Sequence, residues 1–305
     1  MNAIPYYHVD VFSSEPFKGN GLIVFTETAG FTADTMQVLT REMRQFESIF
    51  LGEIEEIGEA NGNSVRARIF TCEEELDFAG HPVLGAAATL HDLHKRDEDK
   101  VEWTFELNVK TVSVITEKKG ERYEAVMNQG KADFGRVLNE AETRSILAYI
   151  DAVPEDLYPG LYPTVVSTGL PYLIVPFSHH FFQAKIGAPG LQELLHSFGA
   201  QFIGLLDIEG RRIRTGTNDG SVEDIATGSL VGPACAFLVQ HGLAKRDTII
   251  KFGQGSNLLR ESELYAALRT GGNNSMDVFV SGCVCKIASG ILESNGISSF
   301  AYPQA

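Results

Sequence analysis

The chain has 305 residues, of which 44% are hydrophobic and 21% are charged, an ordinary composition for a globular protein with a substantial core. Its formal net charge of −15 argues against a nucleic-acid-binding surface, and no Lys/Arg cluster offsets that charge. No apolar stretch approaches the roughly 18 residues that span a bilayer. The N-terminus lacks the basic and apolar segments of a secretory signal. We therefore expect a cytoplasmic protein.

Hydrophobic periodicity predicts alternating strands and helices along the chain. In the first half we expect strands at 5–13, 20–26, 47–54, 64–71, 101–107, 109–117 and 122–128, and helices at 33–45 and 82–94. In the second half we expect helices at 139–151, 189–198 and 229–242, with the strand set repeated. A hairpin at 114–127 indicates sheets that are mixed or partly antiparallel. Most of 128–162 is interpreted as the connection between the halves.

The start of the helix at 82–94 has the features of an anion site. Pro82 favours the first helical turn and holds His81 in an extended conformation, and Gly80 allows another group to approach the backbone. The free N–H groups and partial positive charge of the helix end would attract an anion. The alternative is an ordinary helix start at which His81 is only a cap.

The second half of the chain repeats the first. Asp77 and Asp224 lie 147 residues apart, and each follows an Arg-x-Arg strand and precedes a glycine and an apolar helix of small residues. The segment 36–51 aligns without gaps with 191–206. A single repeat of about 150 residues predicts two similar domains that face each other. We expect them at 1–130 and 131–305, and the alternative left open is that the last strand or tail returns to the first domain.

No cofactor motif accompanies this repeat. The glycines form neither a dinucleotide-binding fingerprint nor a P-loop, so no nucleotide cofactor is expected. The four cysteines have no Cys-x-x-Cys pair and no nearby ligands at zinc spacing, so no metal is expected. Cys283 and Cys285 alternate along an expected strand, which favours packing in the core.

Glu47 has an unusual context for a carboxylate. It lies between a helix end and an apolar strand, where burial is expected, and its repeat counterpart is Phe202. A carboxyl in apolar surroundings has a raised pKa and can accept and donate a proton near neutrality. The structural alternative is a salt bridge at the helix end, for example with Arg44.

Two facing domains with matched helix N-termini would form a cleft for a small carboxylate. His81 and Ser229 occupy equivalent places, one residue after a glycine. Acid–base groups are expected at the rim of this cleft, which makes Asp224 a further candidate.

Several motifs together resemble the PhzF family of phenazine-biosynthesis-like isomerases along nearly the whole chain. They are Phe17-Lys18-Gly19-Asn20, Glu47 before Phe50-Leu51, Asp77-Phe78-Ala79-Gly80-His81-Pro82, Glu223-Asp224 with Ala226-Thr227-Gly228-Ser229, and Gln254-Gly255 with Arg260 and Ser262. The resemblance implies an α+β fold like that of diaminopimelate epimerase. Each of its two pseudo-symmetric domains is a mixed or antiparallel sheet wrapped around a central helix, and the protein is usually a homodimer.

The resemblance also implies a cofactor-free reaction on a small carboxylate such as trans-2,3-dihydro-3-hydroxyanthranilate. Glu47 would move a proton between two ring carbons along one face, without a metal. His81, Asp224 and Ser229 would hold the substrate and steer protonation. The implied binding groups are the backbone N–H groups of Gly80 and Gly228, together with Thr227 and Asn20.

The chain departs from the usual family pattern in ways that leave the substrate open. The family usually has proline where Gly21 and Ile225 stand, and glycine and proline where Leu259 and Glu261 stand. The segment 45–48, Gln-Phe-Glu-Ser, is only partly like the family's Asn-x-Ser-Glu-Thr.

Two other functions stay open at this point. An amino-acid racemase or epimerase of the same fold would use one cysteine at each helix start. Cys235 lies seven residues beyond Gly228, about 10 Å along the helix, which is too far for that role. A non-catalytic protein that binds small acids is the other alternative.

Overall fold

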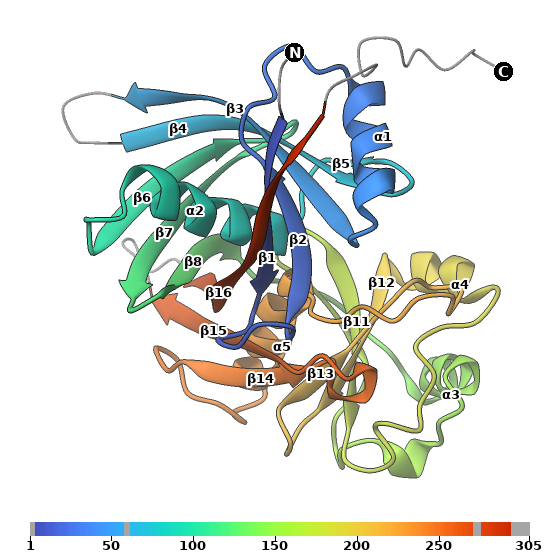
Figure 1. Ribbon diagram of the computed structural model, residues 1–305. Helices are drawn as coiled ribbons and strands as arrows, with labels where there is room; N and C mark the ends of the chain where they lie inside the picture. Colours follow the sequence, from blue (N-terminus) through green and yellow to red (C-terminus); the bar gives the residue numbers. More distant parts are fainter. Residues whose placement is uncertain (1–3, 58–61, 271–275, 294–305) are drawn as a thin grey trace, which may run out of the picture. The chain divides into compact units, whose positions relative to one another are not determined.

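The computed structural model describes residues 4–57, 62–270 and 276–293, which form two compact units (Figure 1). Unit 1 contains the described residues 4–57, 62–127 and 281–293. Unit 2 contains 128–270 and 276–280. The chain passes from one unit to the other within strands β8 (Arg122–Lys131) and β16 (Met276–Leu292). The last described strand therefore contributes to both units.

Unit 1 is a mixed sheet with two helices. Its strand order is β1-β2-β3-β4-β6-β7-β8, and β16 pairs antiparallel with the other side of β1. The β2–β3 and β4–β6 pairs are parallel, and the short β5 pairs with β4. The elements are β1 (Ile4–Val11), β2 (Asn20–Phe25), α1 (Ala33–Met43), β3 (Glu47–Ile57), β4 (Gly62–Thr71), β5 (Glu75–Leu76), α2 (Gly80–His94), β6 (Lys100–Glu106) and β7 (Thr111–Lys119).

Helix α2 is the core of unit 1. It contacts β1, β2, β3, β6 and β7, and every residue from Gly80 to His91 is buried. A helix that is apolar on all sides is stable only when it is surrounded. Its small residues allow close packing, since a Cβ on Gly85 would lie 2.5 Å from Cδ2 of Leu22. The sheet therefore wraps around α2 and holds its N-terminus in a defined place.

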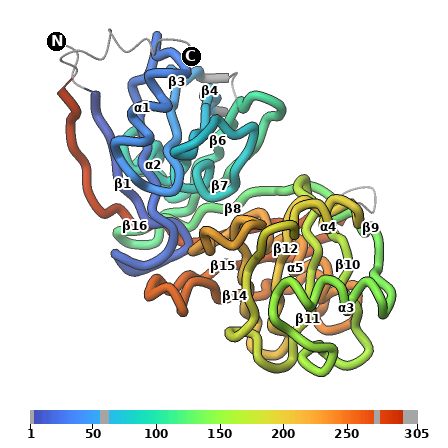
Figure 2. Tube along the Cα trace, turned by 90° about the vertical axis from the view of Figure 1, so that its right-hand side faces the viewer, coloured from blue at the N-terminus to red at the C-terminus, as the bar shows by residue number. Residues whose placement is uncertain are grey.

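Unit 2 repeats this plan with the strand order β15-β14-β13-β12-β11-β10-β9. Helix α5 contacts β10, β11, β12, β13 and β15, and β9 pairs with β10 at the edge of the sheet (Figure 2). The elements are β9 (Asp133–Val137), α3 (Glu140–Tyr149), β10 (Thr164–Ser167), β11 (Pro171–Phe177), α4 (Leu191–Phe198), β12 (Phe202–Asp207), β13 (Arg212–Arg214), α5 (Gly228–Gln240), β14 (Ile250–Gln254) and β15 (Ser262–Thr270), with 3-10 turns at Pro154–Asp156 and Ser256–Leu258.

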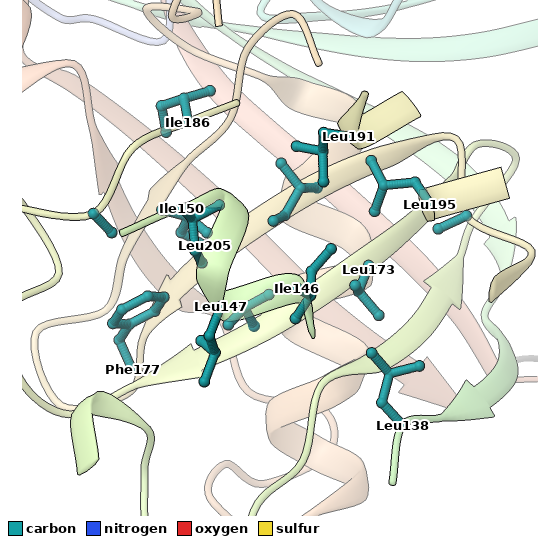
Figure 3. Packing of buried hydrophobic residues seen from close by; sticks show 14 of the residues in the cluster. Leu138, Ile146, Leu147, Ile150, Leu173, Phe177, Ile186, Leu191, Leu195 and Leu205 are labelled. Carbon is teal, nitrogen blue, oxygen red and sulfur yellow. The ribbon is translucent and has the colours of Figure 1, made fainter. Parts of the chain in front are cut away.

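A second apolar cluster in unit 2 holds α3 and α4 against the sheet. Ile146 and Leu147 of α3 and Leu195 of α4 are buried beside Leu173 and Leu205 of the strands (Figure 3). Burying such side chains contributes about 1.5–3 kcal/mol each. Unit 2 thus has its own core.

The internal repeat is visible in matching strand pairs. Glu47 begins β3 and lies opposite Leu22 of the parallel strand β2. Phe202 begins β12 and lies opposite Tyr172 of the parallel strand β11. The alignment of Glu47 with Phe202 is therefore confirmed. The predicted α+β fold, with a sheet wrapped around a central helix, is confirmed as well.

Three local expectations were wrong. The predicted connection at 128–162 contains a strand, β9, because its residues pair with β10. The strand expected at 47–54 is longer than predicted, because β3 continues through an acidic segment to Ile57, and residues 58–61 lie outside the described residues. Cys283 and Cys285 are partly exposed instead of buried in the core. None of the described helices is long and apolar enough to cross a membrane.

Candidate active site

Unit 1 brings Glu47 and His81 together. Glu47 is the first residue of β3 and His81 is the second residue of α2, and both are buried, with 6% and 5% of their surface exposed. The Nδ1 of His81 lies 3.4 Å from Oε2 of Glu47. The expectation that Glu47 is buried is confirmed. The pair joins a carboxyl and an imidazole, two groups that can exchange protons with a substrate.

His81 is neutral at physiological pH. Burial lowers the pKa of His81 to about 3, because the charged imidazolium would lose its hydration. Its Nε2 is buried and has no hydrogen-bond partner among the described residues. A buried polar atom without a protein partner costs free energy unless water or a ligand satisfies it. This nitrogen is therefore available to a bound molecule.

The N-terminus of α2 completes this part of the site. The helix begins at Gly80 with Ala79 as its N-cap, no side chain caps it, and its first turn has no acidic residue. The interpretation of His81 as a mere cap was wrong, because His81 lies inside the helix. Uncapped N–H groups at a helix start favour an anion. Asn20, at the start of β2, is also buried.

A bidentate ion pair holds the loop that leads into α2. Arg68 of β4 donates from Nε and Nη2 to the two carboxylate oxygens of Glu75, at 2.7 and 2.6 Å. This pair lowers the pKa of Glu75 and raises that of Arg68, mainly through the hydrogen bonds. Asp77, which follows, is exposed. We call this ion pair of Arg68 and Glu75 a clamp, because it orders the segment before Gly80.

Unit 2 builds a corresponding start of helix α5. The helix begins at Gly228 with Thr227 as N-cap, again without a side-chain cap. The hydroxyl of Thr227 donates instead to Oδ2 of Asp224, at 2.5 Å. Gln254 of β14 accepts from the N–H of Thr227 at 2.9 Å and donates to the carbonyl of Asp224 at 2.9 Å. Gln254 therefore fixes the turn that presents Asp224.

Ser229, the second residue of α5, is positioned by a tyrosine. Its hydroxyl lies 2.8 Å from the hydroxyl of Tyr172 on β11. The amide of Gln129 donates to the carbonyl of Gly228 at 2.9 Å. Sequence reasoning missed both Tyr172 and Gln129. The signal for Tyr172 was a tyrosine inside an apolar strand, because a buried tyrosine hydroxyl usually has a partner.

A second bidentate ion pair leads into α5. Arg214 of β13 donates from Nε and Nη2 to Glu223, at 2.8 and 2.9 Å. Its Nη1 donates to the carbonyls of Phe181 and Ala184. Arg68 and Arg214 are the second arginines of the two Arg-x-Arg strands, so the repeat extends to the clamps. The sequence pattern identified the two arginines but did not indicate which glutamates they bind.

The structure accounts for two positions, Gly21 and Leu259, at which the chain departs from the family pattern. A Cβ on Gly21 would lie 2.4 Å from Oε1 of Gln45 and 3.3 Å from Nε2 of His8. The side chain of Gln45 thus occupies the space next to Gly21 that a larger residue would need. Leu259 has φ of +59° and is 91% exposed, a conformation that favours the family's glycine. Nothing in the structure explains Ile225 and Glu261.

The cysteines do not fit a two-thiol mechanism. Cys235 is buried in α5, and burial raises its pKa to about 12, so it is not a thiolate near neutrality. Cys72 follows β4, and its Sγ lies 3.7 Å from the carbonyl of Gln45. In the described part of the chain, no three His, Cys, Asp or Glu side chains are grouped to hold a metal ion.

Comparisons with known proteins agree with these features. The family model for phenazine biosynthesis-like protein, PhzC-PhzF, matches residues 9–202. The chain belongs to the PhzF family. A trans-2,3-dihydro-3-hydroxyanthranilate isomerase of Pseudomonas chlororaphis is 30% identical over 282 residues, which cover 91% of this chain and 95% of the relative. The curated relatives are isomerases, and this chain is an enzyme of that class.

Solved structures of PhzF relatives have the same fold. A predicted epimerase from Pseudomonas aeruginosa is 42% identical, with a TM-score of 0.86, over 95% of this chain and 99% of that chain. A PhzF family protein from Bacillus anthracis has a TM-score of 0.79 at 19% identity, over 96% of this chain and 100% of that one. A hydroxyproline epimerase from Agrobacterium vitis shares only the fold, at 10% identity and a TM-score of 0.59, over 96% of this chain and 91% of that chain.

Proposed function

We propose that this PhzF-family isomerase moves a proton within a small cyclic or unsaturated carboxylate and needs no cofactor. Trans-2,3-dihydro-3-hydroxyanthranilate, named for the relative from P. chlororaphis, is the first substrate to test. The observation that carries the proposal is the buried carboxyl of Glu47 beside the neutral imidazole of His81 at an uncapped helix N-terminus.

In the proposed reaction, the carboxylate of Glu47 takes a proton from one carbon and becomes a carboxylic acid. The electron pair of the broken C–H bond moves the double bond. Glu47 then returns the proton to a second carbon, so the protein ends the cycle unchanged. A positioned acid–base group contributes typically 10²- to 10⁴-fold to such a step. The Nε2 of His81 would bind a polar group of the substrate.

We propose further that the N–H group of Gly80 and that of Gly228 are substrate-binding groups, and that Asp224 and Ser229 steer protonation. Uncapped helix starts support the first assignment. The bond network around Thr227 and the contact of Ser229 with Tyr172 support the second, because each holds a polar side chain in one orientation. Asn20 and Thr227 are further proposed binding residues.

Turnover in deuterated water tests the role of Glu47. Nuclear magnetic resonance would follow both the shift of the double bond and the entry of deuterium at carbon. We expect Glu47→Gln to keep the fold and reduce turnover by about 10²- to 10⁴-fold, because the amide cannot accept the proton. Glu55→Gln is the matched control, since Glu55 lies exposed on the same strand.

Undiminished turnover in Glu47→Gln would remove Glu47 from the mechanism. Loss of turnover in both Glu47→Gln and Glu55→Gln would instead indicate that turnover depends on the total negative charge and not on Glu47 in particular. If the wild-type protein binds the compound without turnover, the substrate assignment is wrong, and other unsaturated carboxylates should be tested in the same way.

A further inference from the structure

A β-bulge in unit 1 interrupts the pairing of β1 with β16. His8 lies opposite Ala288 and Val9 lies opposite Lys286, so Ile287 is an extra residue in β16. Bulges re-aim neighbouring side chains and occur often beside binding sites. Here the bulge borders a cavity of about 800 Å³, which lies between β1, β16, the second half of α2 and the turn of the β7–β8 hairpin. We name it the bulge pocket.

The bulge pocket is distinct from the candidate active site. Asp92, which lines the bulge pocket, is twelve residues after Gly80 in the same helix, which places the two about 18 Å apart along the helix axis. All the residues that line the pocket belong to unit 1. Its volume is within the range of about 300–1,000 Å³ that small-molecule sites occupy.

The carboxylate of Asp92 is already neutralised. Oδ1 accepts from the hydroxyl of Tyr123 at 3.1 Å and lies 2.9 Å from Nη2 of Arg96. Oδ2 lies 3.4 Å from Nζ of Lys286, whose ammonium also sits 5.4 Å from the ring centroid of Tyr7. Asp92 therefore organises one wall of the pocket and offers no free negative charge to a ligand.

Two cations of the hairpin keep their charge available. Lys118 donates to the carbonyl of Arg96 at 2.8 Å, and neither Lys118 nor Arg122 forms an ion pair with a carboxylate in the part of the chain that the structure describes. With Arg96 and Lys286, the pocket has four cations against the three carboxylates of Glu15, Asp92 and Glu121, in a chain of net charge −15.

The floor of the pocket is apolar. Val9, Ala88 and Val284 are buried beneath it. An inorganic anion would leave this surface unused, whereas a ring system would cover it. We propose that the bulge pocket binds an organic anion with an apolar ring system, with its acid group at Arg122 and Lys118 and its rings over the floor.

Protection of Cys285 from alkylation tests the proposal, because Cys285 lines the bulge pocket. Burial raises the pKa of Cys285, so alkaline pH is needed for labelling. The probe is 2-naphthoate, the uncharged 2-naphthamide and inorganic phosphate are ligand controls, and Cys72 is the internal reference. Mass spectrometry of the peptides would give the alkylation rate at each cysteine.

We expect 2-naphthoate to slow alkylation of Cys285 and not of Cys72, with little protection by 2-naphthamide or phosphate. Arg122→Gln should weaken the apparent affinity by about tenfold, because one charged contact is lost. Lys100→Gln, an exposed lysine of unit 1 outside the pocket, should leave the affinity unchanged. No protection of Cys285, or equal protection in Arg122→Gln, would overturn the proposal. Binding of 2-naphthoate at the candidate active site would not slow the alkylation of Cys285, because this thiol lies in the bulge pocket.

Discussion

At the scale of single residues, the environment of His81 determines its charge. An exposed histidine is partly protonated near neutrality, whereas burial keeps the imidazole of His81 neutral. A neutral imidazole can donate one hydrogen bond and accept another without placing a second charge beside Glu47. The contact at 3.4 Å is therefore not an ion pair at physiological pH. The same burial makes the stability of the fold depend on pH.

The pH dependence follows from the lowered pKa of His81. Between its ordinary value of 6.5 and its folded value of about 3, the unfolded chain binds a proton that the folded chain does not. The free energy of unfolding therefore falls as pH drops through this range, by about 1.4 kcal/mol per pH unit from this group. We expect His81→Gln to remove this contribution, as measured by urea unfolding between about pH 5 and pH 7.

His196→Gln is the control for this experiment, because His196 is exposed on α4. An unchanged pH slope in His81→Gln would show that His81 is accessible to protons in the folded protein, and it would remove the neutral imidazole from the proposed mechanism.

At the scale of elements, an arginine–glutamate ion pair precedes the N-terminus of the central helix in each unit. A strand arginine binds a glutamate in the segment that leads into the central helix, as Arg68 binds Glu75 and Arg214 binds Glu223. The side chain of Arg68 is 25% exposed and that of Arg214 is 7% exposed. Solvent screens the first pair more than the second, so the two clamps should differ in their contribution to stability.

We expect Arg214→Gln to lower the free energy of unfolding by about 3 kcal/mol, because it leaves the partly buried carboxylate of Glu223 without its ion-pair partner and two buried carbonyls without their donor. Arg68→Gln should cost less, about 1 kcal/mol. Amide hydrogen exchange would report on each unit separately. Equal losses in the two variants would contradict the assigned difference in burial. A loss below about 1 kcal/mol in Arg214→Gln would contradict the clamp.

At the scale of the whole molecule, the order of the chain links the two units. Unit 2 is formed by the middle of the chain, and the segment after Val280 returns to unit 1 as the partner of β1. A strand without a partner exposes its backbone N–H and C=O groups to water. The last part of β16 should therefore stabilise unit 1 and leave the core of unit 2 unaffected.

A chain that ends after Val280 tests this arrangement. We expect the amides of β1 to exchange faster with deuterium, because their partners in β16 are absent. The amides of β11 and β12 should keep their protection, since the cluster that covers them belongs to unit 2. Unchanged protection of β1 would show that the pairing with β16 contributes little to stability.

The sequence by itself determined the elements and the repeat. Hydrophobic periodicity located the helices and most strands, because each signal is local to its own segment. The proline and glycine at the start of α2, and the matching glycine of α5, marked both helix starts. The alignment of Glu47 with Phe202 came from the repeat and agrees with the strand register.

Only the tertiary structure decided which side chains meet. The contact of Glu47 with His81 depends on how β3 packs against α2. The partner of Ser229 is Tyr172, 57 residues away, and the bulge pocket depends on one extra residue in β16. Such contacts join segments far apart in the chain, and their geometry is set by the packing of the whole core, which no local pattern of residues encodes.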